Sequence, residues 1–284
     1  MDGIGQIFWI FLIIVSLAPM VQQRLLAYAR IQIMERLQRK RGSQVITLIH
    51  REESISFLGF PLVRYIDIED SELVLQAIRQ TPKDKPIDMV LHTPGGLALA
   101  ASQIAHALVR HPAPVTVFVP HYAMSGGTLI ALAADEIILD ESAVLGPVDP
   151  QLGEYPAASI LAAARTDNPN RDDRTLILAD MAAKAIPQVE ETIFELLRKH
   201  MEEPRARELA KMMSDGRWTH DYPLTVEKLQ EYGLPVRTGL PDELHNLMRL
   251  YPQSGRRRPG VEYVPAPYHP GGRDAAPPGA GRRG

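Results

Sequence analysis

The central part of the chain alternates between two apolar patterns, and this alternation restricts the fold more than any other feature. Short runs rich in branched apolar residues, typical of buried strands, are followed by longer segments with helical period. Such alternation predicts an α/β domain over residues 44–251. The expected strands are residues 45–49, 87–92, 115–119 and 136–139, and the expected helices are residues 69–80, 97–110, 128–134 and 176–200.

The composition excludes several classes of site. The 284 residues contain no cysteine, which excludes a disulfide scaffold, a thiol nucleophile and any cysteine-based metal site. A metal site would have to use histidine and carboxylate, but the nine histidines include no His-Glu-x-x-His pair. No phosphate-binding P-loop is present either. We therefore expect neither a metal nor another cofactor.

The first 43 residues differ from the rest. Residues 3–23 carry no charge, and residues 7–18 are apolar except for Ser16, a stretch long enough to span a bilayer. No basic segment precedes it, which favours an uncleaved transmembrane anchor in residues 1–23 over a cleaved signal. The alternative is a buried core helix. Residues 24–43 are expected to form a basic juxtamembrane helix, which predicts a single-pass protein whose main domain is cytoplasmic.

The other end, residues 252–284, is rich in proline, glycine and arginine. Such a segment cannot bury enough apolar surface to fold alone, so we predict a disordered tail. Basic tails can contact anionic lipid or nucleic acid, but no nucleic-acid-binding module accompanies this one. A solvated tail is the simpler interpretation, and we expect no nucleic-acid partner.

Two glycine-rich turns each follow a predicted buried strand, where open α/β sheets bind their ligands. The first turn is His92-Thr93-Pro94-Gly95-Gly96. Adjacent glycines permit positive φ, close approach of another backbone and exposed N–H groups. This turn can therefore form half of an oxyanion hole. The alternative is a tight turn without a chemical role.

Residues 121–127, His-Tyr-Ala-Met-Ser-Gly-Gly, form the second turn. Ser125 lies at the amino end of the helix that follows, where the dipole and free N–H groups favour developing negative charge. This position suits a nucleophile, and the alternative is that Ser125 only caps the helix. The turn is not the Gly-x-Ser-x-Gly elbow of α/β-hydrolases, because Ala123 occupies the place of the first glycine.

Together the two turns resemble those of serine peptidases of the Clp-protease and signal-peptide-peptidase class. The resemblance extends over residues 44–240. Its strongest segments are similar to those of the membrane-anchored group named serine dehydrogenase proteinases. These segments are Ser125-Gly126-Gly127-Thr128, Ala134-Asp135-Glu136-Ile137 and Leu145-Gly146-Pro147-Val148-Asp149-Pro150-Gln151.

The resemblance implies a ClpP/crotonase-like fold of repeated ββα units, with Ser125 as the nucleophile. The oxyanion hole would use the backbone N–H groups of Gly96 and Gly126, with Gly95 as a further candidate donor. The implied substrates are extended peptides or membrane-protein segments, and related enzymes assemble into homo-oligomers.

A serine nucleophile needs a base. In Clp proteases a histidine follows the serine by about 25 residues, but the corresponding residues 145–150 contain none. Signal-peptide-peptidase-like enzymes use a lysine on a later helix, and Lys184 fits that position. Its sequence neighbours are apolar, and burial among them would favour the neutral amine, while Pro187 is expected to kink the helix nearby. We therefore predict a Ser125–Lys184 dyad.

Three other residues are candidates for the base or for an auxiliary role. His121 precedes Ser125 by four residues and would line the entrance of the site. Asp149, between two prolines, is either a turn residue or a group that orients Lys184 or binds substrate. For His220, packing is the simpler role. The sequence thus predicts a membrane-anchored serine endopeptidase, with an acyl-CoA-handling crotonase or a non-catalytic scaffold as alternatives.

Overall fold

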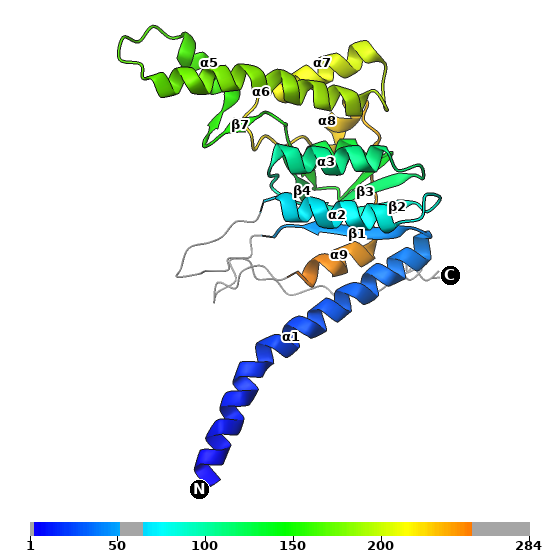
Figure 1. Cartoon of the computed structure of the whole chain (residues 1–284). Helices are drawn as coiled ribbons and strands as arrows, with labels where there is room; N and C mark the ends of the chain where they lie inside the picture. The colour runs from blue at the N-terminus through cyan, green and yellow to red at the C-terminus, as the bar shows by residue number, and fades with distance from the viewer. Residues whose placement is uncertain (1–2, 52–64, 252–284) are drawn as a thin grey trace, which may run out of the picture.

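In the computed structural model, which describes residues 3–51 and 65–251, a five-stranded parallel sheet forms the centre of the protein (Figure 1). The strands lie side by side in chain order, and neighbouring strands are parallel. They are β1 (Gln44–Ile49), β2 (Ile87–His92), β3 (Val115–Val119), β5 (Glu136–Leu139) and β9 (Val236–Thr238). Crossover connections between parallel strands are right-handed as a rule. Because the order of the strands does not reverse, the helices that join the first strands lie on one face of the sheet.

Helices cover both faces of this sheet. One face carries α2 (Ile68–Gln80), α3 (Ala98–Val109) and α4 (Gly126–Leu132), and the other carries α9 (Asp242–Arg249) and the end of α1 (Gly3–Arg41) (Figure 1). Leu37 of α1 and Leu244 of α9 belong to the same cluster as Val90 and Phe118 of the strands. All residues of β2 and β3 are buried, as expected for strands covered on both sides.

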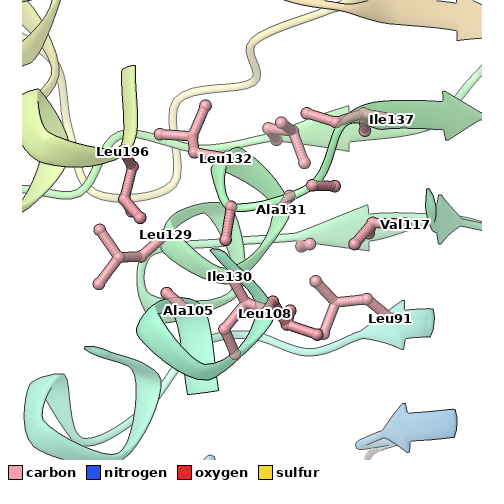
Figure 2. Close-up of a cluster of buried hydrophobic side chains, with 14 of the residues drawn as sticks. Leu91, Ala105, Leu108, Val117, Leu129, Ile130, Ala131, Leu132, Ile137 and Leu196 are labelled. Carbon is pink, nitrogen blue, oxygen red and sulfur yellow. The ribbon is translucent and has the colours of Figure 1, made fainter. Parts of the chain in front are cut away.

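Figure 2 shows the core between the sheet and α4. Leu91, Val117 and Ile137 extend from three adjacent strands, and Ile130 of α4 lies in the same cluster. Leu196 of α6 (Asp173–Leu197) lies beyond α4. All five side chains are almost completely buried, and their removal from water fixes α4 against the sheet. The residues just before α4 are held in place as a consequence.

A further helical layer lies beyond α3 and α4 (Figure 1). It consists of α5 (Ala157–Arg165), α6, α7 (Glu203–Ser214) and α8 (Val226–Glu231). The C-terminal part of α6 enters the main core through Ile193, Phe194 and Leu197. Its earlier part packs with α5 in a separate cluster that includes Ala182 and Ile160. The two parts of α6 therefore have different surroundings.

A second, shorter ladder crosses the carboxyl ends of the main strands. β4 (Tyr122–Ala123) pairs with β6 (Val144–Leu145). Single bridges extend this ladder from Ala123 to Thr93 and from Leu145 to Leu224. The ladder joins the segments that leave β2, β3 and β5, so it holds the two glycine-rich turns side by side. A hairpin of β7 (Gln151–Leu152) and β8 (Tyr155–Pro156) follows it.

Most elements expected from the sequence are confirmed. The four predicted strands and the helices at residues 69–80 and 97–110 lie within one residue of their predicted bounds. α4 begins two residues earlier than predicted, and α6 begins three residues earlier. The α/β class with a parallel sheet is also confirmed, and the sheet is consistent with a ClpP-like fold.

The structure tests the prediction for the N-terminal segment but not the prediction for residues 252–284. α1 is one helix that includes both the expected anchor and the expected juxtamembrane segment. Within residues 3–51 and 65–251 no helix is both long and apolar enough to cross a membrane, so the predicted span is not found there. Near its end, α1 packs on the sheet through Ile33, Met34 and Leu37. The predicted tail at residues 252–284 lies outside the described residues.

Candidate active site

Ser125 has an unusual backbone conformation between β4 and α4. Its φ is 50° and its ψ is −116°, and within the described ranges no other non-glycine residue has a positive φ. Such a conformation costs about 1–3 kcal/mol and persists mainly where function requires it. The Ser125 side chain makes no capping hydrogen bond to α4, so the capping alternative is not supported.

The Gly95-Gly96 turn lies directly against Ser125. Gly95 has a φ of 111°, and a Cβ added there would lie 2.8 Å from the Ser125 Cβ, an approach that only glycine permits. A Cβ added at Gly126 would lie 3.6 Å from the Gly96 nitrogen. The two turns predicted to form an oxyanion hole are therefore in contact.

The hydrogen bonds of the turns distinguish the candidate donors. Gly95 N–H donates to Thr93 Oγ1 at 3.2 Å. Because this N–H group already has an acceptor, it is not available as the oxyanion donor that the sequence predicted. Ile66 N–H donates to Gly95 O, and Ile66 O accepts from Leu97 N–H. Because backbone groups alternate in direction along an extended segment, the N–H and C=O of Gly96 between them point away from Ile66. No hydrogen bond from Gly96 N–H or Gly126 N–H to another backbone group occurs among the described residues. These two N–H groups can therefore receive an oxyanion.

Ser125, Gly96 and Gly126 line a cavity of about 730 Å³, a volume in the range of ligand-binding pockets. Apolar side chains contribute much of its wall, among them Leu97, Leu129, Val148, Leu152 and Val189. The polar side chains of Asp149, Gln151 and His220 also line it. The cavity therefore brings a strained serine, two backbone donors and a carboxylate–imidazole pair to one place.

Asp149 and His220 form a hydrogen-bonded pair. His220 Nδ1 lies 2.8 Å from Asp149 Oδ1, and Asp149 is only 3% exposed. Gln151 Nε2 donates to Asp149 Oδ2 at 2.6 Å, so both carboxylate oxygens have partners. A buried carboxylate beside Nδ1 fixes the proton on that nitrogen and leaves Nε2 to accept a proton. This is the arrangement that a general base for serine requires.

Thr128 connects the Ser125 turn to the segment that carries Asp149. This fully buried residue accepts a hydrogen bond from Gly146 N–H at 3.0 Å, and its hydroxyl lies within 2.9 Å of the carbonyl oxygens of Ala123 and Gly146. Gly146 precedes Asp149 by three residues. The start of α4 and the loop after β6 are thus fixed relative to each other.

Lys184 is not buried, although burial was the condition for its predicted role as a neutral base. Its side chain is 67% exposed, and Nζ pairs with Asp180 at 2.5 Å. The cavity is lined by its neighbours Ala185, Gln188 and Val189, but not by Lys184 itself. Burial, which would favour the neutral amine, is absent, and the structure does not bring Lys184 to Ser125. α6 continues as a helix through Pro187.

His121 is also not among the residues that line the cavity. Its Nε2 is 3.4 Å from a guanidinium nitrogen of Arg51, and its ring meets that of His92 edge-on at 5.5 Å between centroids. The expected place at the entrance is therefore not found. In the described part of the chain, no group of three or more histidine, aspartate or glutamate side chains is arranged to hold a metal.

Sequence reasoning named Asp149 and His220 but missed that they form a pair. They are separated by 71 residues, and neither lies in a regular element. A signal was present for Asp149, because it lies between Val148 and Pro150 in a segment of low polarity. A carboxylate buried in such a place needs a partner. The identity of that partner was not readable from the sequence.

Comparisons with known proteins agree with this geometry. Residues 1–276 match the model of a protein family described as ClpP-like SDH-type serine proteinase. Two proteins of Methanocaldococcus jannaschii, both described as uncharacterised, are similar over most of their lengths. One is 56% identical over 262 residues, which cover 92% of this chain and 92% of that protein. The other is 51% identical over 268 residues, which cover 94% of this chain and 92% of that protein.

Proposed function

We propose, because the chain belongs to the family of ClpP-like SDH-type serine proteinases, that it is an endopeptidase in which Ser125, His220 and Asp149 form a catalytic triad. One observation carries the proposal. The strained Ser125 and the hydrogen-bonded pair of His220 with the buried Asp149 line the same cavity. Their order along the chain is serine, aspartate, histidine, and a triad is recognised by geometry and roles rather than by sequence order.

In the first step, Ser125 Oγ attacks the carbonyl carbon of the scissile peptide bond. His220 Nε2 takes the hydroxyl proton, and Asp149 Oδ1 stabilises the imidazolium through its bond to Nδ1. No hydrogen bond of Ser125 Oγ to another described residue is found, and a serine–base contact is often completed only when substrate binds. Collapse of the tetrahedral intermediate transfers the proton to the leaving amine and leaves an acyl group on Ser125. Water then hydrolyses this ester by the reverse proton path.

The Gly96 and Gly126 N–H groups are the proposed oxyanion donors. Both are backbone groups of turns in contact with Ser125, and Gly126 N–H, at the first residue of α4, has no acceptor within the helix. Fixed donors need no reorganisation when charge develops on the carbonyl oxygen, and each contributes about 10²–10³-fold to kcat.

The substrate proposed for this cavity is an extended peptide segment. Gly96 has its C=O and N–H on the side opposite Ile66, so its carbonyl can accept a backbone N–H from a strand that adds beside it. The apolar wall of the cavity favours apolar side chains next to the cleaved bond. An acyl-CoA enzyme would need the oxyanion donors but would not use the Asp149–His220 pair as a base for serine. The predicted cytoplasmic location and homo-oligomeric state stay predictions.

The test is cleavage of casein and of a peptide library by the full chain. Ser125→Ala should abolish cleavage, and a fluorophosphonate probe should label wild-type protein on Ser125, as identified by mass spectrometry. Ser142→Ala is the matched control, because Ser142 lies in an exposed turn after β5; it should cleave and label like the wild type. Cleavage that persists in Ser125→Ala, or a folded wild-type protein without any cleavage, would contradict the proposal.

A further inference from the structure

A buried histidine outside the cavity contacts the back of the oxyanion turn. His50 follows β1 directly and is 5% exposed. Its Nδ1 lies 3.0 Å from Thr93 Oγ1, and its Nε2 lies 3.1 Å from Asp70 Oδ2. Both ring nitrogens therefore have side-chain partners. None of these three residues takes part in the peptide cleavage proposed above, although they lie directly behind Gly95 and Gly96.

Asp70 is itself fixed at the start of α2. Asp70 N–H donates to Asp67 Oδ1 at 3.0 Å, and Asp67 N–H donates to Asp70 Oδ2 at 3.1 Å, which completes a capping box. Ile66, which immediately precedes Asp67, forms a backbone bridge with Gly96. The start of α2 is therefore joined to the oxyanion turn twice, through the backbone of Ile66 and through the Asp70–His50–Thr93 contacts.

Thr93, in the first turn, connects the two turns. Its side chain accepts the Gly95 N–H. Its backbone N–H donates to Tyr122 O at 3.3 Å, and its C=O accepts from Met124 N–H at 3.0 Å. The residue is fully buried. Thr93 thus fixes Gly95 on one side and the residues just before Ser125 on the other.

The direction of each hydrogen bond in the series Asp70–His50–Thr93–Gly95 follows from the carboxylate of Asp70, which can only accept. The Asp70 carboxylate accepts, so His50 Nε2 donates to it and His50 Nδ1 is left as an acceptor. Thr93 then donates its hydroxyl proton to His50 Nδ1 at 3.0 Å, a shorter contact than the 3.3 Å from Thr93 Oγ1 to Gly95 O. A lone pair of Thr93 Oγ1 is left to accept from Gly95 N–H. The Gly95 N–H is thereby held by Thr93 Oγ1, while Gly95 O accepts a hydrogen bond from Ile66 N–H at 2.8 Å.

We propose that Asp70, His50 and Thr93 are positioning residues that hold the Gly95-Gly96 turn so that Gly96 N–H meets the oxyanion. The inference rests on the proposed function. A misplaced Gly96 N–H weakens binding of the transition state more than binding of the substrate, because the oxyanion forms only in the transition state. The effect therefore falls on kcat rather than on KM.

Thr93 offers a matched pair of variants. Thr93→Val removes the hydroxyl but keeps a methyl group beside Gly127, where a Cβ added at Gly127 would lie 2.6 Å from Thr93 Cγ2. Thr93→Ser keeps the hydroxyl and loses that methyl group. With the full chain and one peptide substrate, Thr93→Val should lower kcat about tenfold to hundredfold with KM changed less than about threefold, whereas Thr93→Ser keeps kcat within about threefold. The opposite ranking would overturn the proposal, because packing of the methyl group would then be the role of Thr93.

Variants of His50 test whether Asp70, His50 and Thr93 act together on the Gly95-Gly96 turn. His50→Leu should lower kcat in the same direction as Thr93→Val, and His50→Asn, which keeps a polar group near the position of Nδ1, should recover part of the loss. The double variant His50→Leu/Thr93→Val should lose little more than the worse single variant, because both remove the same hydrogen bond. Losses that multiply would mean that the two residues act separately and would overturn the series.

One measurement separates this proposal from the proposed function. Hydrogen exchange of the Gly95 amide, followed by NMR in folded protein, needs no activity. The amide should be protected in the wild type and in Thr93→Ser and should exchange at least about tenfold faster in Thr93→Val, since its acceptor is lost. Equal exchange in all three proteins would overturn the positioning role, whether or not the protein cleaves peptides. Absence of Ser125-dependent cleavage together with the expected exchange pattern would instead contradict only the peptidase function.

Discussion

The middle of α6, which carries Lys184, and the loops that carry Asp149 and His220 both border the cavity of Ser125, but they hold their charged groups differently. Lys184 and Asp180 pair four residues apart on one helix, and both side chains are about two-thirds exposed. Asp149 and His220 come from distant parts of the chain, and Asp149 is buried. An exposed pair of this kind contributes about 0.3–0.5 kcal/mol, whereas removing the partner of a buried carboxylate leaves an uncompensated charge.

The difference shows what a sequence neighbourhood can and cannot establish about a helix. Of the apolar residues around Lys184, Ala182 and Ile186 pack in the cluster with α5 and Ala185 lines the cavity. Met181 and Ala183 are exposed, as Lys184 is. Lys184 shares its face with Asp180, and the spacing of four residues between them already indicates a solvent-exposed ion pair. That spacing was the better guide, because it reports which face a side chain occupies.

The largest expected effect comes from replacing each candidate base. His220→Ala should lower kcat/KM for peptide cleavage on the order of 10⁵-fold, because loss of the base in a serine triad removes nearly all triad catalysis. Lys184→Ala should change kcat/KM less than about twofold, since the exposed Lys184 does not line the cavity. Both variants are measured with the same peptide and checked for unchanged circular dichroism. If Lys184→Ala is inactive and His220→Ala is active, the assignment of the base is reversed.

The carboxylates of the two regions give the next contrast. Asp149→Asn should lower kcat on the order of 10⁴-fold, because an amide beside Nδ1 favours the wrong tautomer of His220. Asp180→Asn is the matched control, and it removes only the exposed partner of Lys184. We expect its kcat to equal that of the wild type in the same assay. Wild-type activity in Asp149→Asn would mean that Asp149 has only a structural role.

The parts of the fold that could be predicted are those set by neighbouring residues. The all-apolar run of β3 is a strand because its side chains pack on both faces of the sheet. The turn before α4 needed glycines at Gly126 and Gly127, where a Cβ would approach Ala101 or Thr93 to less than 3 Å. These contacts involve residues distant in sequence, but they leave a local pattern, the adjacent glycines after Ser125, so the position of Ser125 was readable from the sequence.

The parts that could not be predicted depend on contacts between distant segments. Gly95 and Gly96 are equivalent as sequence, and only the hydroxyl of Thr93 and the bridge to Ile66 distinguish their N–H groups. His220 lies in a loop whose position depends on the packing of α7 and α8 around it. Its meeting with Asp149 follows from that packing and not from any pattern near either residue.

The smallest expected effect concerns a second histidine near the turns, His92, which contrasts with His220. His220 has a carboxylate partner, whereas His92 Nδ1 is buried and has no hydrogen-bond partner among residues 3–51 and 65–251. Burial, together with the nearby His121, Arg51 and His50, lowers the pKa of His92 from 6.5 to about 3. His92 is therefore neutral in the folded protein over the range in which a base for Ser125 must act.

This low pKa predicts how stability depends on pH. Between pH 6.5 and 3 the unfolded chain protonates His92 and the folded protein does not, so the free energy of unfolding falls as the pH decreases through this range. At pH 5 the loss from His92 is about 2 kcal/mol relative to pH 7.5. His92→Phe keeps a ring beside Tyr122, whose centroid lies 4.3 Å away, and cannot titrate. Urea unfolding at pH 7.5 and pH 5 should therefore show a smaller difference for His92→Phe than for the wild type, and equal differences would mean that His92 is protonated in the folded protein.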